Sequence, residues 1–137
     1  MRQPVTDAVV QWLRDQGHDL TLIGPLVDGD DTEWAEVSAA TARAATSGDS
    51  DVAVLFCWSG TGACMAANKV KGARAALCAD SETARLARKY NHANVLVMSM
   101  RATSPAVAVE TTEAFLAAPW GEDDFDIRNV RVVDGLA

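Results

Sequence analysis

Residues 52–69 read Val-Ala-Val-Leu-Phe-Cys-Trp-Ser-Gly-Thr-Gly-Ala-Cys-Met-Ala-Ala-Asn-Lys, and this stretch decides the fold class. An apolar run from Val52 to Phe56 stops at a cysteine, a glycine-punctuated turn follows, and a small-residue helical segment begins at Gly62. The order predicts a strand, a tight loop and a helix N-terminus. Backbone N–H groups at such a junction attract anions such as phosphate or an enolate oxygen. A thiol at the same place is stabilised as the thiolate, so one short segment can supply both a base and an anion site.

Strands and helices alternate along the rest of the chain. Strands are predicted at 20–23, 52–56, 73–78 and 95–98, helices at 4–16, 33–46, 62–68, 81–90 and 105–118, and a last short helix or strand within 127–136. Strands that are apolar throughout and alternate with helices indicate an α/β fold with a parallel sheet covered on both faces. Ligands of such folds bind beyond the carboxyl ends of the strands, where Cys57 and Ser99 both fall.

Length, charge and cysteine content limit the classes of protein to which this chain can belong. The 137 residues fit one domain, and a net charge of −7 argues against general binding to nucleic acid or anionic membranes. No apolar run approaches the roughly 20 residues of a membrane span, and no signal peptide is expected. Cys57, Cys64 and Cys78 are odd in number and lack C-x-x-C spacing, which predicts reduced thiols in a cytoplasmic protein. His18 and His92 are too few to predict a metal site.

A specific set of residues lies between Leu55 and Arg101. Its members are Cys57, Gly60-Thr61-Gly62, Ala66-Ala67-Asn68-Lys69-Val70, Gly72, Arg74-Ala75-Ala76-Leu77-Cys78, Ala84-Arg85-Leu86-Ala87-Arg88, Asn91, Asn94-Val95-Leu96 and Arg101. In order and spacing this set, which covers about a third of the chain, resembles the ribose-5-phosphate isomerase B / galactose-6-phosphate isomerase subunit family.

The resemblance implies a Rossmann-like three-layer fold with a mostly parallel sheet, formed by a single domain over residues 1–137. It also implies a homodimer or higher oligomer with shared active sites, and no metal or organic cofactor. The family's first strand, with the Gly-x-Asp-His-Ala-Gly-like loop that follows it, has no counterpart before Pro4. The sheet is therefore expected to lack that strand.

The resemblance further implies aldose–ketose isomerisation of a phosphorylated sugar, a pentose phosphate or similar, through an enediolate. Cys57 matches the family's proton-shuttling cysteine, and Ser59 matches its loop hydroxyl. The backbone of Gly60, Thr61 and Gly62 matches the anion hole. These residue types suit the chemistry, which needs a base near C1 and C2 and preorganised donors for the developing oxyanion.

Five further residues are implied to bind the substrate. Asn91 matches a sugar-contacting asparagine and Arg101 a phosphate-binding arginine, while Arg128 and Arg131 are loosely similar to basic residues that family members send to the phosphate. Tyr90 occupies the position where the family commonly has the histidine that opens the sugar ring. A tyrosine there can donate a hydrogen bond but is a poor base at neutral pH.

Other interpretations of the same residues stay open at this point. The chain could be a non-catalytic or incomplete sugar-phosphate-binding subunit that needs a partner chain, or a nucleotide-binding domain in which Asp80 is the one candidate for the ribose. Cys57 also fits a small buried hydrophobe. Arg101 also fits a solvated loop residue, and Arg128 and Arg131 fit partners for the acidic segment before them.

Overall fold

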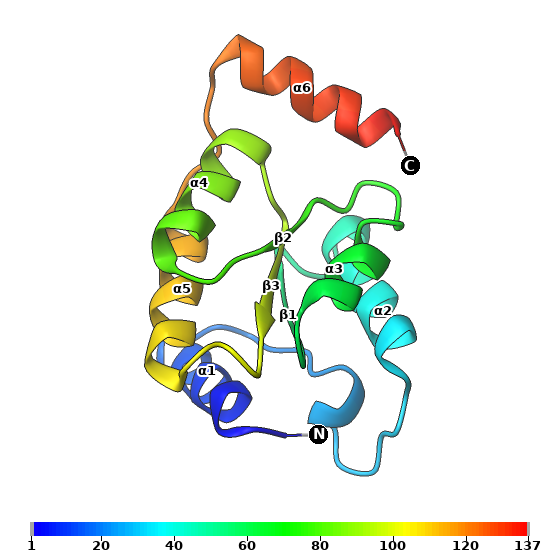
Figure 1. Cartoon of the computed structure of the whole chain (residues 1–137), viewed down its shortest axis with the longest axis vertical. Coiled ribbons are helices and arrows are strands. Elements are labelled where there is room, and N and C mark those ends of the chain that lie inside the picture. The colour runs from blue at the N-terminus through cyan, green and yellow to red at the C-terminus, as the bar shows by residue number, and fades with distance from the viewer. Residues whose placement is uncertain (1, 137) are drawn as a thin grey trace.

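The computed structural model describes residues 2–136 and confirms the α/β fold (Figure 1). The elements in chain order are α1 (Pro4–Asp15), a short 3-10 turn η1 (Gly24–Leu26), α2 (Trp34–Ser47), β1 (Ala53–Cys57), α3 (Thr61–Ala67), β2 (Ala75–Leu77), α4 (Ser81–Asn91), β3 (Val95–Ser99), α5 (Pro105–Ala117) and α6 (Asp124–Gly135). The strands form a wholly parallel sheet in the order β1-β3-β2. Helices α1 to α5 begin and end within one residue of the predicted bounds.

The three layers follow from the central position of β3. Helices α1, α4 and α5 cover one face of the sheet, and α2 and α3 cover the other (Figure 1). Alternate side chains of β3 enter the two cores: Leu96 and Met98 pack towards Phe115, whereas Val95 and Val97 pack towards α2 and α3. All five side chains are fully buried. A strand covered on both faces needs such a continuous apolar run, which is why the sequence predicted it correctly.

Side-chain caps set the starts of α4 and α5 as expected. Asp80 accepts a hydrogen bond from the backbone N–H of Thr83 at 2.7 Å and caps α4. Ser104 accepts one from Val107 at 3.2 Å, directly before the proline that opens α5. These side chains satisfy amides that have no partner within the helix. No helix within residues 2–136 is long and apolar enough to cross a membrane.

The strand predicted at 20–23 is absent, so that prediction is wrong. These residues are extended and apolar, but within residues 2–136 no backbone hydrogen bond joins them to a neighbour. An extended segment becomes a β-strand only when a neighbouring strand lies close enough to form backbone hydrogen bonds with it. The nearest strand is β1, and a cavity lies between the two segments. Residues 20–23 are therefore extended but stay outside the ladder of β1, β3 and β2.

The tail, for which the sequence left helix and strand open, forms helix α6. It lies across the end of the molecule beside α4 (Figure 1). Its one ion pair with another described residue joins Asp134 to Arg74 at 2.8 Å, and none of its side chains is buried. Helix α6 is thus held to the domain by few contacts.

The side chain of Asn94 forms hydrogen bonds that join the turn before β2 to the turn before β3. Its buried side chain accepts from the Arg74 N–H at 2.8 Å and donates to the Gly72 carbonyl at 3.0 Å. Asn94→Ala leaves both backbone groups without a partner, and we expect it to lower the free energy of unfolding by about 1–3 kcal/mol in urea titrations. The exposed Asn91→Ala is the control and should change it by less than about 0.5 kcal/mol. An equal loss of unfolding free energy in both variants would show that the two hydrogen bonds of Asn94 do not stabilise the fold.

Candidate active site

Cys57 is the last residue of β1 and lies half-buried at the carboxyl edge of the sheet. Its carbonyl accepts the N–H of Met100 at 2.9 Å, and the carbonyl of Trp58 accepts the N–H of Arg101 at 3.0 Å. The Ser99 hydroxyl also donates to the Trp58 carbonyl at 2.8 Å. These bonds extend the pairing of β1 with β3 beyond the strands. They bring Cys57, Ser99 and Arg101 together, as expected of strand ends in one parallel sheet.

Two glycines give the loop after Cys57 its shape. Gly60 has φ +83°, and a Cβ there would lie 2.5 Å from Cδ1 of Leu77. A Cβ on Gly62 would lie 3.0 Å from the ring of Trp34. A side chain at Gly60 would thus meet both backbone strain and a clash. Sequence reasoning missed the roles of Leu77 and Trp34, because no local signal shows which distant side chains a loop touches.

The loop presents free donors beside the thiol. The backbone N–H groups of Gly60, Thr61 and Gly62 form no hydrogen bond with residues 2–136, and α3 closes its first turn only at Cys64, whose N–H bonds to the Gly60 carbonyl at 3.0 Å. The hydroxyls of Ser59 and Thr61 share a hydrogen bond of 2.8 Å. The arrangement can therefore offer a thiol, two hydroxyls and several amides to one small anionic ligand.

The other two thiols have different surroundings. Burial raises the pKa of Cys78 to about 12, and the nearby charge of Asp80 adds to the shift. Burial also raises the pKa of Cys64, whose Sγ lies 3.5 Å from the carbonyl oxygen of Ala75. Both thiols are thus kept protonated at neutral pH. Cys57 is the cysteine that lies at the carboxyl end of a strand and borders the glycine loop.

The remaining predicted site residues lie at the opposite end of the sheet. Tyr90 and Asn91 end α4, next to the amino end of β3, and Arg128 and Arg131 lie on α6 at the same end (Figure 1). All four are exposed. Within residues 2–136 neither arginine forms an ion pair, so the expected pairing with the acidic segment is not found. A single chain does not bring these four residues to Cys57.

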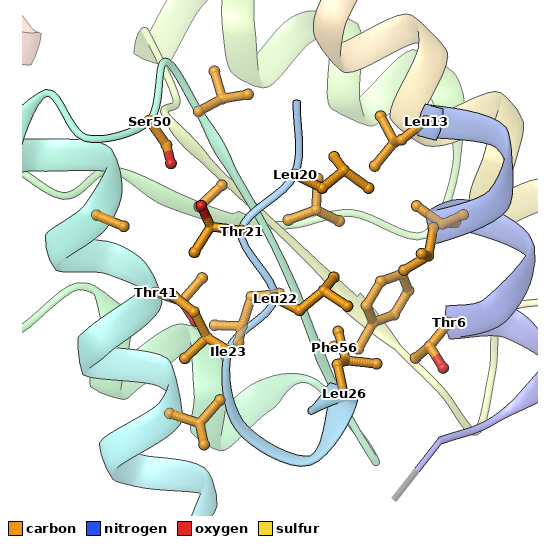
Figure 2. Close-up of a pocket in the computed structure, with 18 of the residues that line it drawn as sticks. Thr6, Leu13, Leu20, Thr21, Leu22, Ile23, Leu26, Thr41, Ser50 and Phe56 are labelled. Carbon is orange, nitrogen blue, oxygen red and sulfur yellow. The ribbon is translucent and has the colours of Figure 1, made fainter. Parts of the chain in front are cut away.

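Neither a metal-binding cluster of the described residues nor a cavity suited to a sugar phosphate marks this site. Residues 2–136 contain no group of three or more His, Cys, Asp or Glu that could hold a metal ion. A cavity of about 480 Å³ runs along the free edge of β1, and Cys57 is among the residues that line it (Figure 2). It is lined mainly by apolar side chains, which suits an apolar occupant better than a sugar phosphate.

Comparisons with known proteins agree with this geometry. The Ribose/Galactose Isomerase family model matches residues 3–134. Ribose-5-phosphate isomerase B of Mycobacterium leprae is 35% identical over 131 residues, covering 94% of this chain and 78% of that protein. The structure of Trypanosoma brucei type B ribose 5-phosphate isomerase superposes with a TM-score of 0.89 at 34% identity, covering 98% of this chain and 91% of that one. Ribose-5-phosphate isomerase B from Mycoplasma genitalium, solved with bound ribulose-5-phosphate, gives a TM-score of 0.86 at 28% identity, covering 96% and 87%.

The three thiols should differ in their reactivity towards an alkylating agent. During a brief exposure to iodoacetamide at pH 7.5 we expect Cys57 to be modified first, because burial raises the pKa of Cys64 and of Cys78 and favours their unreactive thiol forms. Peptide mass spectrometry at several time points measures the order, with the unfolded protein as the control in which all three react. Modification of Cys64 or Cys78 ahead of Cys57 would contradict this account of the site.

Proposed function

The chain belongs to the Ribose/Galactose Isomerase family and is an aldose–ketose sugar-phosphate isomerase, and we propose that it interconverts an aldose and a ketose phosphate of pentose size or similar with Cys57 as the base. The observation that carries this proposal is the half-buried thiol at the end of β1, followed at once by a loop with free amides. A base and an oxyanion site must lie within a few ångströms of the same two carbons for this reaction. Both features border one loop here.

We propose the following reaction for the open-chain aldose. The Cys57 thiolate removes the proton from C2, and the electron pair moves to form the C1–C2 double bond of an enediolate. Negative charge develops on the C1 oxygen, where the loop amides and the hydroxyl of Ser59 donate hydrogen bonds. Cys57 then returns the proton to C1, while the C2 hydroxyl gives its proton to the C1 oxygen, so that C2 becomes the ketose carbonyl and C1 carries the hydroxyl. The proton that leaves C2 is balanced by the one delivered to C1.

We assign the binding of the substrate's phosphate group to cationic side chains. Arg101 follows the β3 end directly and lies beside the loop, since its N–H bonds to Trp58. A guanidinium binds a phosphate through two parallel hydrogen bonds and so fixes the distance to the reacting carbons. We assign Arg101, Arg128 and Arg131 to substrate binding, together with Tyr90 and Asn91.

We propose a homodimer in which each active site takes residues from both subunits. Helix α6 supports this, because it has no buried side chain and exposes Phe125, Val132, Val133 and Leu136, with Leu136 80% exposed. Their spacing places them along one stripe of a helix, and a stripe of this size normally needs a partner. Trp58 and Met65 are exposed near the other end of the sheet. Pairing these two surfaces in a two-fold dimer would bring Arg128 and Arg131 to the partner's loop.

We place the reaction in the cytoplasm. All three cysteines are unpaired, and free thiols persist where the redox environment is reducing. A catalytic thiolate at Cys57 needs that environment to avoid oxidation.

Direct turnover tests the assignment of Cys57. The wild type should isomerise at least one member of a panel of aldose and ketose phosphates with four to six carbons. Cys57→Ser should lower kcat by at least about 100-fold, because a general base of this kind typically contributes that much. Cys64→Ser is the matched control and should keep most of the activity. A Cys57→Ser enzyme with wild-type kcat would refute the proposed base.

Mixed dimers test the shared site. Cys57→Ala and the double variant Arg128→Ala/Arg131→Ala should each be inactive or nearly so as homodimers. If each site combines one subunit's thiol with the other's arginines, subunits mixed at equal ratio regain about a quarter of the wild-type activity, because half of the dimers are mixed and each has one intact site. Each variant mixed with itself is the control. Recovery absent in verified mixed dimers would contradict a shared site.

A further inference from the structure

The segment that joins α5 to α6, residues 118–123, is bound to the end of α4. The N–H of Gly121 donates to the carbonyl of Lys89 at 2.9 Å, and Nε2 of His92 donates to the carbonyl of Gly121 at 2.8 Å. A Cβ on Gly121 would lie 2.6 Å from the carbonyl oxygen of Lys89, so glycine is the residue that allows this close approach. Both backbone groups of Gly121 therefore hold the segment in one place.

Three side chains pack on the indole of Trp120, which lies in this segment. The imidazole of His92 is stacked on it, with the ring centroids 4.9 Å apart and the planes 2° from parallel. The guanidinium carbons of Arg74 and Arg88 lie 5.3 Å and 5.5 Å from the ring centroid, which is within the range of cation–π attraction. We call Arg74, Arg88, His92 and Trp120 the Trp120 cluster. It joins α4, the turn before β2 and the segment that leads to α6.

His92 follows α4 in a backbone conformation that usually belongs to glycine. Its φ is +49°, in the left-handed region, and glycine is the commonest residue where a helix ends in this way. A glycine there would lack the imidazole that stacks on Trp120 and donates to Gly121. Helix capping alone therefore does not account for a histidine at this position, whereas its contacts with the segment do.

Arg74 extends the Trp120 cluster to the far end of α6. Its Nε donates to the His92 carbonyl at 2.8 Å, and its Nη1 donates to Asp134, near the end of α6, at 2.8 Å. Within residues 2–136, no other hydrogen bond joins a side chain of α6 to a residue outside that helix. The cluster therefore holds α6 at two points, through Gly121 before its first residue and through Asp134 near its last.

Core packing does not explain Trp120. The residue is 44% exposed and belongs to neither of the two hydrophobic cores. Its neighbours in the cluster are polar or charged. Such a cluster gains little from burial, but stacked rings and planar guanidinium groups have defined orientations, so it fixes one geometry.

We infer that Trp120 is a positioning residue for the isomerase site, because it sets the direction in which α6 leaves the domain. The inference rests on the proposed shared site, in which α6 carries Arg128 and Arg131 to the glycine loop of the partner subunit. Arg131 lies about 10 Å along α6 from its first residue, so a tilt of about 20° would move its Cα by roughly 3–4 Å. A hydrogen bond from a guanidinium to phosphate is about 2.7–2.9 Å long and does not survive such a shift.

Steady-state kinetics of the full chain gives the first test. Trp120→Ala should raise KM for the sugar phosphate at least about 10-fold and keep kcat within about 3-fold, because it disturbs phosphate binding and leaves Cys57 and its loop in place. Trp120→Phe keeps a ring on which His92 can stack, so its KM should stay within about 3-fold of wild type. Trp12→Ala is the matched control, since Trp12 also lies beside a histidine, His18, and it should leave KM unchanged. A wild-type KM in Trp120→Ala would overturn the inference.

Mixed dimers show in which site Trp120 acts. When Cys57→Ala is paired with Trp120→Ala, the one intact thiol belongs to the Trp120→Ala subunit. The α6 that reaches this thiol belongs to the Cys57→Ala subunit, whose Trp120 is intact. We therefore expect mixed dimers, purified through two different tags, to have the wild-type KM. A KM that stays raised would overturn the inference, because Trp120 would then act within its own subunit.

A reference mixture separates this inference from the shared site on which it rests. Cys57→Ala paired with Arg128→Ala/Arg131→Ala tests the shared site alone. If this pair regains activity while the Cys57→Ala and Trp120→Ala pair keeps a raised KM, the shared site stands and the role of Trp120 is wrong. If the reference pair stays inactive in verified mixed dimers, the shared site is wrong and the inference falls with it.

Hydrogen exchange followed by mass spectrometry tests the hold on α6 without any turnover. His92→Ala removes both the stacking and the hydrogen bond to Gly121 but keeps Trp120. Helix α6 has twelve residues, and a helix of that length is marginal by itself in water. Peptides from α6 should therefore exchange at least about 10-fold faster in His92→Ala and in Trp120→Ala than in wild type, while peptides from α5 keep their rate. Unchanged exchange of α6 in both variants would overturn the inference.

Discussion

The pairing of β1 with β3 is the constraint on which the site depends. The ladder joins Ala53 to Val95 at one end and Cys57 to Ser99 at the other, and two further backbone bonds continue it into the loops beyond. Because β3 is buried on both faces, its position is fixed by the two cores. Cys57 and its loop are therefore anchored to a strand that is buried on both faces, and a proton transfer between adjacent carbons requires a base that is held in place.

The sequence contained enough local information to predict most of the fold. Helix bounds followed from caps such as Asp80 and Ser104, and β1 and β3 followed from continuous apolar runs. The failure at residues 20–23 has a physical reason, since strand formation depends on a neighbour and not on composition alone. The site was predictable at Cys57 and Gly60, where a strand end meets a glycine loop. The side chains that shape that loop, Leu77 and Trp34, were not predictable, because they come from distant elements.

The structure also divides the predicted site into two groups. Cys57, the glycine loop and Arg101 gather at the carboxyl edge of the sheet, while Tyr90, Asn91 and the two arginines of α6 lie at the other end (Figure 1). For Tyr90 and Asn91 the separation follows from the predicted order, because a helix that directly precedes a parallel strand ends at that strand's amino end. For Arg128 and Arg131 it does not, because the sequence left the structure of the tail open. Helix α6 has no buried side chain and exposes Phe125, Val132, Val133 and Leu136. Such an apolar stripe is suited to packing against another subunit.

The measurement that tests the central claim most directly is isomerisation in D₂O, with the product analysed by NMR for deuterium at the carbon that receives the proton. A thiol that carries the proton between C2 and C1 exchanges it with solvent, so the account predicts deuterium at that carbon in the wild-type product. It also predicts that Cys57→Ala loses isomerisation and exchange together. Product formed without deuterium would indicate direct hydride transfer between the carbons, and exchange that persists in Cys57→Ala would identify a different base; either result would contradict the account.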